Sequence, residues 1–255
     1  MATVAARPNR LFRFRGLSAF FATELRVQLH EGLAILTSMI VQGVLLVFVT
    51  ILAPGYLGVA LVGALLFSVF QMGQRVQNEA AYVRIDHKLN ELYLASPLTA
   101  EAYFLGMAGG VLVAYLSPIL VLVGITELVI HPSPLTWLVL VAAAAALWFI
   151  TISIGYTIST LFRDMRTIWP YASLFYNLFG VLPPVFYPLV LFPASLRTVA
   201  LLIPPSAAAA LINQARVGGI LTGSEILLAA CALTVEAVAM FVFAVAWARR
   251  EVRQV

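Results

Sequence analysis

Long apolar runs dominate the chain, and short polar stretches separate them. About 20 consecutive apolar residues form a helix that crosses the hydrocarbon of a bilayer. Six runs reach roughly this length, at 33–53, 56–73, 102–126, 136–161, 169–187 and 224–247. The pattern predicts an all-α membrane protein with six transmembrane helices in a single transmembrane domain, 1–255.

An amphipathic stretch precedes the first run. Leu17, Phe21, Leu25 and Leu29 recur every four residues, and polar residues occupy the other faces. This spacing predicts an interfacial helix over 16–31. An extension of the first span into the cytosol is the alternative.

The largest polar stretch between two runs is a loop over 74–101. Asp86 is placed to cap a short helix that carries Leu89 and Leu92 on one face, and a Ser-Pro pair marks the next helix start. We therefore expect this loop to be structured.

The segment over 188–222 is apolar but interrupted too often to cross a bilayer as one helix. Prolines punctuate it and the end of the run before it, at Pro183, Pro184, Pro188, Pro193, Pro204 and Pro205. Non-helical backbone at membrane depth survives only where protein or a wet cavity covers it. We expect re-entrant half-helices on the outer face, packed within the assembly, with a plain hydrophobic loop as the alternative.

Composition and charge agree with a membrane location and indicate an orientation. Hydrophobic residues make up 62% of the chain and charged residues 10%, against about a quarter in soluble domains. With six spans, only Arg197 and Arg216 of the 15 lysines and arginines fall on one side. Cytoplasmic segments accumulate basic residues, so both termini are expected in the cytoplasm of a multi-pass protein of the plasma or inner membrane. The basic residues follow span ends, and no nucleic-acid partner is expected.

The chain lacks the motifs of common catalytic and nucleotide sites. A phosphate loop needs a Gly-Lys pair, and the only lysine, Lys88, follows His87. The three histidines and Cys231 have no metal-ligand spacing, and no nucleophile elbow occurs. We expect a non-enzymatic chain that binds no cofactor and no metal.

Some polar and aromatic side chains within the spans are candidates for a substrate pathway, and the polar candidates are Gln42 and Asn177. Gln42, Asn177 and Glu236 fall near the middle of their spans, where an unpaired polar group is costly, so they should face protein or a wet cavity. The fifth run is aromatic and suits an apolar or amphiphilic molecule, although lipid-facing packing is the alternative. Its pathway candidates are Tyr171, Phe175, Phe179, Phe186 and Tyr187.

Two regions resemble the permease subunits of ABC-2 type transporters. The first runs from Lys88 through Leu89, Asn90, Glu91 and Leu92 to Ser96-Pro97, followed by Glu101-Ala102-Tyr103 and Gly106. The second contains Phe179-Gly180, Pro183, Tyr187-Pro188, the run Phe192 to Arg197, Pro204-Pro205 and Arg216. The chain has His87-Lys88 where the family often has Gly-Thr, and Pro204-Pro205 where Asn-Pro is typical.

This resemblance implies an ATP-driven exporter. Two permeases, identical or homologous, would form the pathway as a dimer in membrane lipid, and two cytoplasmic ABC ATPase subunits would bind ATP and magnesium. The helix at 16–31 would be an elbow, and the loop 74–101 would hold a coupling helix. Its contacts with the ATPase are expected at Asp86, Lys88, Leu89, Glu91 and Leu92.

The expected substrate is hydrophobic or amphiphilic, such as a drug, a lipid or a glycan-lipid. Three other functions stay open. Glu127 and Glu236 would suit a proton-coupled secondary transporter. A membrane-embedded transferase would need a cluster of polar groups that the pattern does not contain, and a non-transporting scaffold subunit would share every feature described.

Overall fold

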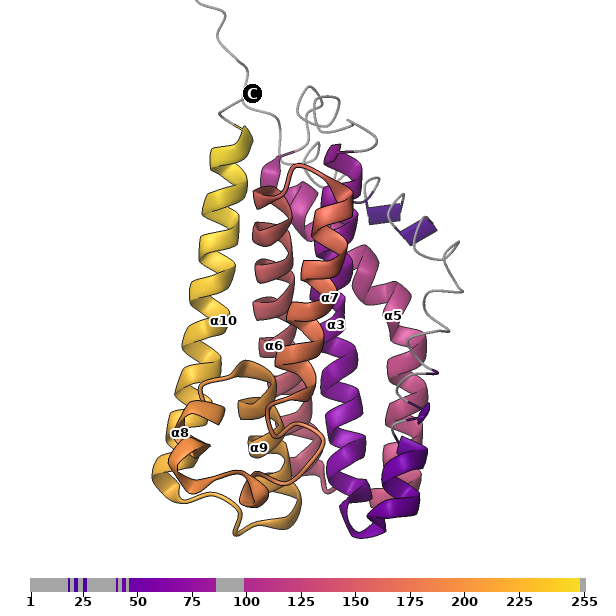
Figure 1. Ribbon diagram of the computed structural model, residues 1–255, viewed down its shortest axis with the longest axis vertical. Helices are drawn as coiled ribbons and strands as arrows, with labels where there is room; N and C mark the ends of the chain where they lie inside the picture. The colour runs from indigo at the N-terminus through magenta and orange to yellow at the C-terminus, as the bar shows by residue number, and fades with distance from the viewer. Residues whose placement is uncertain are drawn as a thin grey trace, which may run out of the picture.

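The computed structural model describes residues 46–85 and 99–252, together with 18, 21, 22, 25, 26, 40, 43 and 44. Every regular element in this part of the chain is helical, as the apolar runs predict. A short 3₁₀ turn, η1 (Pro54–Tyr56), precedes the first long helix. The long helices lie side by side along the molecule's long axis (Figure 1), and they are α3 (Leu57–Ile85), α5 (Ala100–Ile130), α6 (Pro134–Leu161), α7 (Met165–Val181) and α10 (Gly223–Val252).

Four of these helices, α3, α5, α6 and α10, are long and apolar enough to cross a membrane. A bent pair of helices after α7 makes a fifth span if the pair is counted as one. The chain is therefore a membrane-embedded helical protein. The predicted number of six spans stays a prediction, because about half of the first predicted span, 33–53, lies outside the described residues. Within the described half, the stretch 46–52 is continuously helical.

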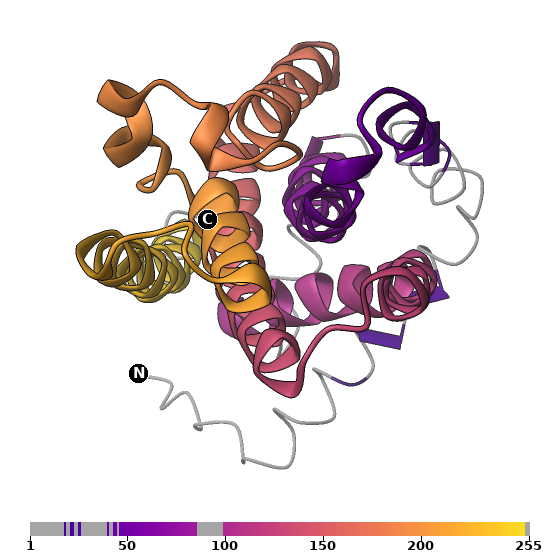
Figure 2. The same cartoon turned by 90° about the horizontal axis from the view of Figure 1, so that it is seen from below.

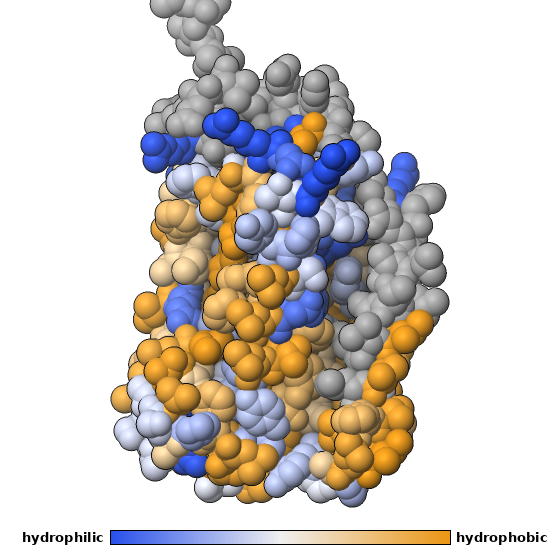
Figure 3. Space-filling model, viewed as in Figure 1, coloured by the Kyte–Doolittle hydropathy of each residue, from blue (hydrophilic) through white to orange (hydrophobic). Residues whose placement is uncertain are grey.

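Polarity separates the two ends of the bundle. Hydrophilic side chains gather at the upper end of Figure 3, where α10 terminates, and apolar side chains cover much of the remaining visible surface. This end, called the C-terminal end below, also holds the end of α6 and the start of α5, since side chains near the end of α10 bond to both. The opposite end holds the segment between α7 and α10 (Figure 1).

Helix α3 packs against α5, α6, α7 and α9, and most of its side chains are buried. Seen from below (Figure 2), it lies between α5 and α7. Its closest approach is to α6, where Gly73 and Gly155 bring the two backbones into contact: a Cβ on Gly155 would lie 2.9 Å from the carbonyl carbon of Gly73. The Thr151 hydroxyl donates to the Phe70 carbonyl across the same crossing, at 2.7 Å.

Helix α3 is longer than the apolar run predicts. The run 56–73 ends in polar residues, which we assigned to the loop 74–101, but the helix continues to Ile85. No proline interrupts 74–85, and the polar side chains there are partly accommodated inside the bundle: Gln77 and Glu79 are buried, and Glu79 lies 3.7 Å from Arg75. The stretch 74–85 is therefore helix, and a loop can begin only after Ile85.

Helix α7 is shorter than predicted. The run 169–187 suggested a span to Tyr187, whereas α7 begins at Met165, after the capping residue Asp164, and ends at Val181. Pro183 and Pro184 follow and cannot donate the backbone hydrogen bonds of a continued helix. At 1.5 Å per residue, its 17 residues span about 25 Å, less than the roughly 30 Å of bilayer hydrocarbon.

The segment 188–222 forms short helices at the end opposite the C-terminal end. They are η2 (Leu189–Leu191), η3 (Ala194–Leu196), α8 (Arg197–Ala200) and α9 (Pro204–Val217). The axes of the two parts, Ala194–Ala200 and Pro204–Val217, meet at 105°. Helix α9 buries most of its side chains and contacts α3, α6 and α10. The interrupted apolar pattern thus corresponds to a bent and packed helical pair.

Few residues of the predicted interfacial helix 16–31 lie within the described part. Those that do are helical, with Phe21 and Leu25 half-buried and Ser18 and Arg26 exposed. The Phe21 ring sits against α5, 3.2 Å from the position a Cβ would take on Gly109. This alternation agrees with an apolar face toward the bundle.

Candidate functional site

The bend between α8 and α9 results from two consecutive prolines. Pro204 and Pro205 occupy the first two positions of α9, where a missing N–H costs nothing. The residue before a proline is driven out of the helical region, and Ile203 has φ −92° and ψ 117°. After α8, the backbone N–H groups of Leu202 and Ile203 instead donate to the carbonyls of Val199 and Ala200, three residues back, both at 3.1 Å. The chain therefore stops, turns and restarts as α9.

A cavity of about 260 Å³ lies at this turn. Its walls come from α3, α6, α7, α10 and the turn itself. The lining residues are Phe70, Ile150, Ile154, Phe175, Phe179, Leu202, Ile203, Pro204, Pro205, Glu236 and Met240. On each of α6, α7 and α10, two lining residues are separated by four positions and therefore lie on the same face of their helix, as expected for straight helices that face a common space. Ten of these residues are apolar, and Glu236 alone carries a charge.

Glu236 lies near the middle of α10, with its side chain half-buried. Its Oε2 is buried and has no hydrogen-bond partner within the described part of the chain. Burying a carboxylate oxygen without a partner is costly, so such a group in an apolar wall marks a functional position more often than a structural one. Phe175 and Phe179, which were predicted for a pathway, meet here with Glu236, which was predicted only to face protein or a wet cavity.

Two other predicted pathway residues on α7 point elsewhere. Tyr171 is 58% exposed and packs on Phe162, with ring centroids 5.7 Å apart. Asn177 is exposed, and its amide donates to the Ser173 carbonyl at 2.8 Å and to the Ser173 hydroxyl at 3.1 Å. Neither side chain lines the cavity. Asn177 is thus satisfied within its own helix rather than by a neighbouring one.

Phe186 and Tyr187 follow α7 rather than belonging to it. Phe186 is buried against Phe67 of α3, with ring centroids 5.6 Å apart, so it serves the core. The Tyr187 hydroxyl donates to the Leu182 carbonyl at 2.6 Å and closes the turn after α7. Tyr187 lines a separate, smaller space of about 50 Å³ beside α9.

The remaining predicted site residues lie outside the described part of the chain. They are Gln42 and the five coupling candidates Asp86, Lys88, Leu89, Glu91 and Leu92. The structure does describe a polar residue on either side of the coupling candidates, Arg84 at the end of α3 and Glu101 at the start of α5. These two residues are called the anchors below.

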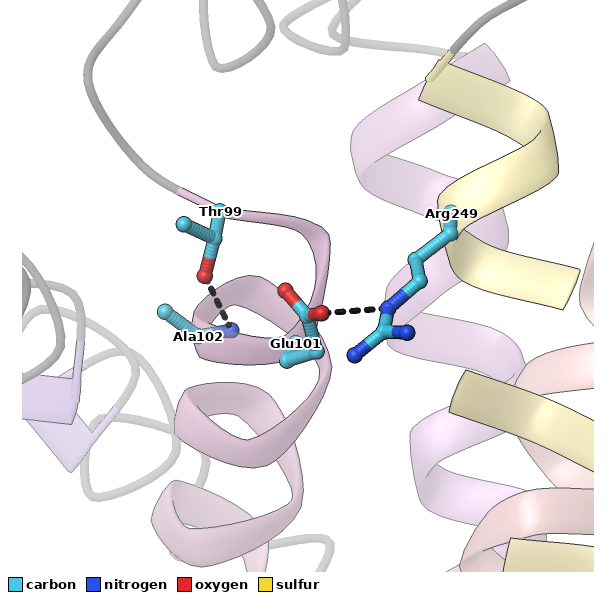
Figure 4. A network of polar contacts seen from close by, with 4 residues as sticks. All are labelled: Thr99, Glu101, Ala102 and Arg249. Atoms are coloured by element: carbon cyan, nitrogen blue, oxygen red, sulfur yellow. Dashed lines mark hydrogen bonds and ion pairs between the residues drawn. The ribbon is translucent and has the colours of Figure 1, made fainter. Parts of the chain in front are cut away.

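The anchor at the start of α5 is an ion pair with α10 (Figure 4). Thr99 caps α5 by accepting from the Ala102 N–H at 3.2 Å, and Glu101 in the first turn accepts from Arg249 Nε at 2.5 Å. Glu101 also has a favourable place at a helix N-terminus. The Glu101 side chain is 32% exposed and that of Arg249 is 61% exposed. Because water screens an exposed ion pair, this pair orients the helix ends more than it stabilises the fold.

The anchor at the end of α3 is Arg84. Its guanidinium donates to the Thr160 carbonyl at 2.9 Å, to the Phe162 carbonyl at 2.6 Å, and to the Ser159 carbonyl. These carbonyls end α6 and have no partner within that helix. Trp247 of α10 adds a hydrogen bond to the Thr160 hydroxyl at 2.9 Å. The ends of α3, α6 and α10 are therefore joined at the C-terminal end.

The sequence did not predict several of the residues that line the cavity, namely Phe70, Ile150, Ile154 and Met240. An apolar residue within a span can face lipid, core or cavity, and its identity does not distinguish these. The resemblance assigns Pro204 and Pro205 to the outer segment and does not indicate that they share a cavity with Glu236. The two consecutive prolines that interrupt the helix, together with a single carboxylate in the following span, were the features of the sequence that could have indicated this cavity.

A scan against protein-family models finds no match for this chain, and a search of curated proteins finds none either. The resemblance to ABC-2 permeases therefore stays a prediction that rests on the residues quoted for it.

Proposed function

We propose that the chain is the membrane subunit of an ATP-driven exporter of the ABC-2 type. Two such subunits would form the substrate pathway, and two separate ATPase subunits would bind ATP and magnesium and supply the driving force. The chain itself would neither bind nucleotide nor catalyse a reaction. It would lie in the plasma or inner membrane with both termini in the cytoplasm.

The bent pair after α7 is the observation that carries this proposal. The resemblance expects a broken, re-entrant element between the fifth and sixth spans, and helices bent by 105° occupy that place in the chain. Their turn lies at a cavity that α7 and α10 also line. A re-entrant element whose tip meets a cavity within a span bundle suits a gate for a transported molecule.

The anchors at the C-terminal end suit the proposed coupling. Arg84 ties the end of α3 to α6, and Glu101 ties the start of α5 to α10. The coupling candidates lie between these two residues. In the proposal, a displacement of the segment 86–98 by the ATPase passes through both anchors to α6 and α10, which line the cavity.

The charge distribution suits the proposed orientation. Arg84, Arg163 and Arg249 lie at or beside helix ends at the C-terminal end, and Arg197 and Arg216 lie in the segment between α7 and α10. With the C-terminal end in the cytoplasm, this distribution obeys the rule that basic residues stay inside.

Copurification tests the proposal. The tagged chain, purified in mild detergent from the cells that naturally produce it, should come out as a complex of two permeases and two ATPases. The isolated chain should bind no ATP analogue, because it has no phosphate loop. Nucleotide binding by the isolated chain, or the absence of any ATPase in the complex, would contradict the proposal.

A proton-coupled secondary transporter is a second candidate, favoured by one observation. Glu236 is a half-buried carboxylate within a span, and such groups often carry protons in transporters. Uptake into vesicles driven by a pH gradient, without ATP and without an ATPase subunit, would favour this function over the first.

A further inference from the structure

The cavity at the α8–α9 turn combines one carboxylate with three aromatic rings. Glu236 comes from α10, Phe70 from α3, and Phe175 and Phe179 from α7. The two α7 rings pack on each other with centroids 4.9 Å apart. No basic side chain is among the lining residues. The cavity therefore brings together two kinds of group that attract cations, a carboxylate and aromatic rings.

Among the residues that the structure describes, none neutralises the carboxylate through a direct contact. Glu236 Oε2 is buried, and no described residue forms a hydrogen bond with it. The start of α9 lies across the same cavity and carries the positive end of a helix dipole, which favours a negative group there. Its first two positions are Pro204 and Pro205, however, and neither has an N–H to donate. The carboxylate thus gains a weak field from α9 and no hydrogen bond from those two residues.

An organic cation would satisfy these features together. Carboxylates pair with cations in apolar surroundings, and aromatic rings bind quaternary ammonium groups through their negative faces. The volume suits a small amphiphile, since a cavity of roughly 150 Å³ holds benzene and this one has about 260 Å³. A molecule with neither a positive charge nor a hydrogen-bond donor would leave the Glu236 oxygen unpaired.

We propose that this cavity is a binding site for amphiphilic organic cations, with Glu236 as the counter-ion and Phe70, Phe175 and Phe179 as aromatic walls. As the substrate class of the exporter, the inference rests on the proposed function. As a binding site it needs no ATPase, and binding alone tests it.

Benzyltrimethylammonium is a suitable probe, because it joins one aromatic ring to a quaternary ammonium group. Radiolabelled probe is titrated against the full chain in lipid nanodiscs, with empty nanodiscs subtracted for partition into lipid. Its neutral isostere neopentylbenzene, which has carbon in place of nitrogen, serves as competitor. The intact chain should bind the cation saturably, and the isostere should displace it at least on the order of tenfold less well than unlabelled cation.

The Glu236→Gln variant keeps the shape of the side chain and removes its charge. We expect it to weaken binding of the cation on the order of tenfold or more, while thermal unfolding stays close to that of the intact chain. Phe175→Leu should weaken binding severalfold by removing one aromatic face. Glu127→Gln is the matched control, because Glu127 accepts from Trp137 at 3.0 Å and does not line the cavity.

Three results would overturn the proposal. They are no saturable binding to the intact chain, equal affinity in Glu236→Gln, and an equal loss in Glu127→Gln, which would indicate a general charge effect. A second copy of the chain filling the cavity would give the first of these. Failure of the ATPase to copurify would leave the binding result unchanged, so the two proposals fail separately.

Discussion

Replacing Gly155 by alanine tests the crossing on which the bundle is built. A Cβ there would lie 2.9 Å from the carbonyl carbon of Gly73 and closer still to its oxygen, and it would also lie 3.1 Å from the Tyr176 hydroxyl. Backbone cannot rotate away as a flexible side chain can, so α3 and α6 must separate by on the order of 1 Å. The separation would loosen the hydrogen bond from Thr151 to the Phe70 carbonyl.

The expected change in the free energy of unfolding combines two destabilising contributions and one stabilising contribution. Overpacking a close contact costs about 1–3 kcal/mol, and the lost hydrogen bond adds about 1 kcal/mol. Alanine regains up to about 1 kcal/mol over glycine in a helix. The net destabilisation should be about 1–3 kcal/mol. Because Phe70 and Ile150 adjoin the crossing and line the cavity, the variant should also bind cavity ligands less tightly.

Gly124→Ala is the matched control, since a Cβ at Gly124 of α5 would meet nothing within 4 Å. Reversible unfolding in mixed detergent micelles, followed by circular dichroism, gives the free energy of unfolding of both variants. Gly124→Ala should be as stable as the intact chain or slightly more stable. Equal stability of the two variants would show that the backbones do not touch at Gly155.

Three further predictions concern the C-terminal end. Arg84→Ala should destabilise the chain by about 1–2 kcal/mol, since it removes the donor to three part-buried carbonyls, and Arg84→Lys should recover part of this; hydrogen exchange at the end of α6 measures both. Hydrogen bonds from a threonine hydroxyl and from backbone N–H groups lower the pKa of Asp164, which caps α7. The stability that Asp164 contributes should therefore be present near neutral pH and be lost as pH falls through its folded pKa; hydrogen exchange in the first turn of α7 should show this loss, and Asp164→Ser should abolish it. The double variant Leu89→Ala, Leu92→Ala should weaken ATPase association or uncouple hydrolysis from transport, whereas Arg253→Ala should do neither; normal association and transport per ATP would refute the coupling assignment.

The sequence predicted which helices exist better than it predicted the residues at which they end. Apolar runs identify spans because bilayer hydrocarbon demands them, and α3, α5, α6 and α10 follow the runs. The end of α3 was misplaced because polar residues inside a bundle look the same in sequence as polar residues in a loop, as Gln77 illustrates by being buried. The end of α7 was misplaced because Phe186 and Tyr187 extend the apolar run past the prolines that end the helix.

The site was predictable only in part. Glu236 stood out as a carboxylate in a span, and Phe175 and Phe179 as aromatic residues four apart. Helix α7 packs on α3 and α10 packs on α6, so their meeting depends on how α3 and α6 cross. That crossing is at Gly73 and Gly155, two glycines far apart in the sequence whose spacing carries no signal of contact. The same limit applies to Tyr171 and Asn177, which share α7 with the cavity residues but point away from it.

Transport in proteoliposomes decides between an ATP-driven exporter and its alternatives. The chain is reconstituted with its ATPase, and accumulation of a labelled amphiphilic cation is followed with ATP, with a non-hydrolysable analogue, and with an ionophore that collapses any proton gradient. We expect accumulation that requires hydrolysable ATP and both subunits and that persists with the ionophore. Accumulation that needs only a proton gradient, or that proceeds without the ATPase, would contradict the assignment as a permease subunit.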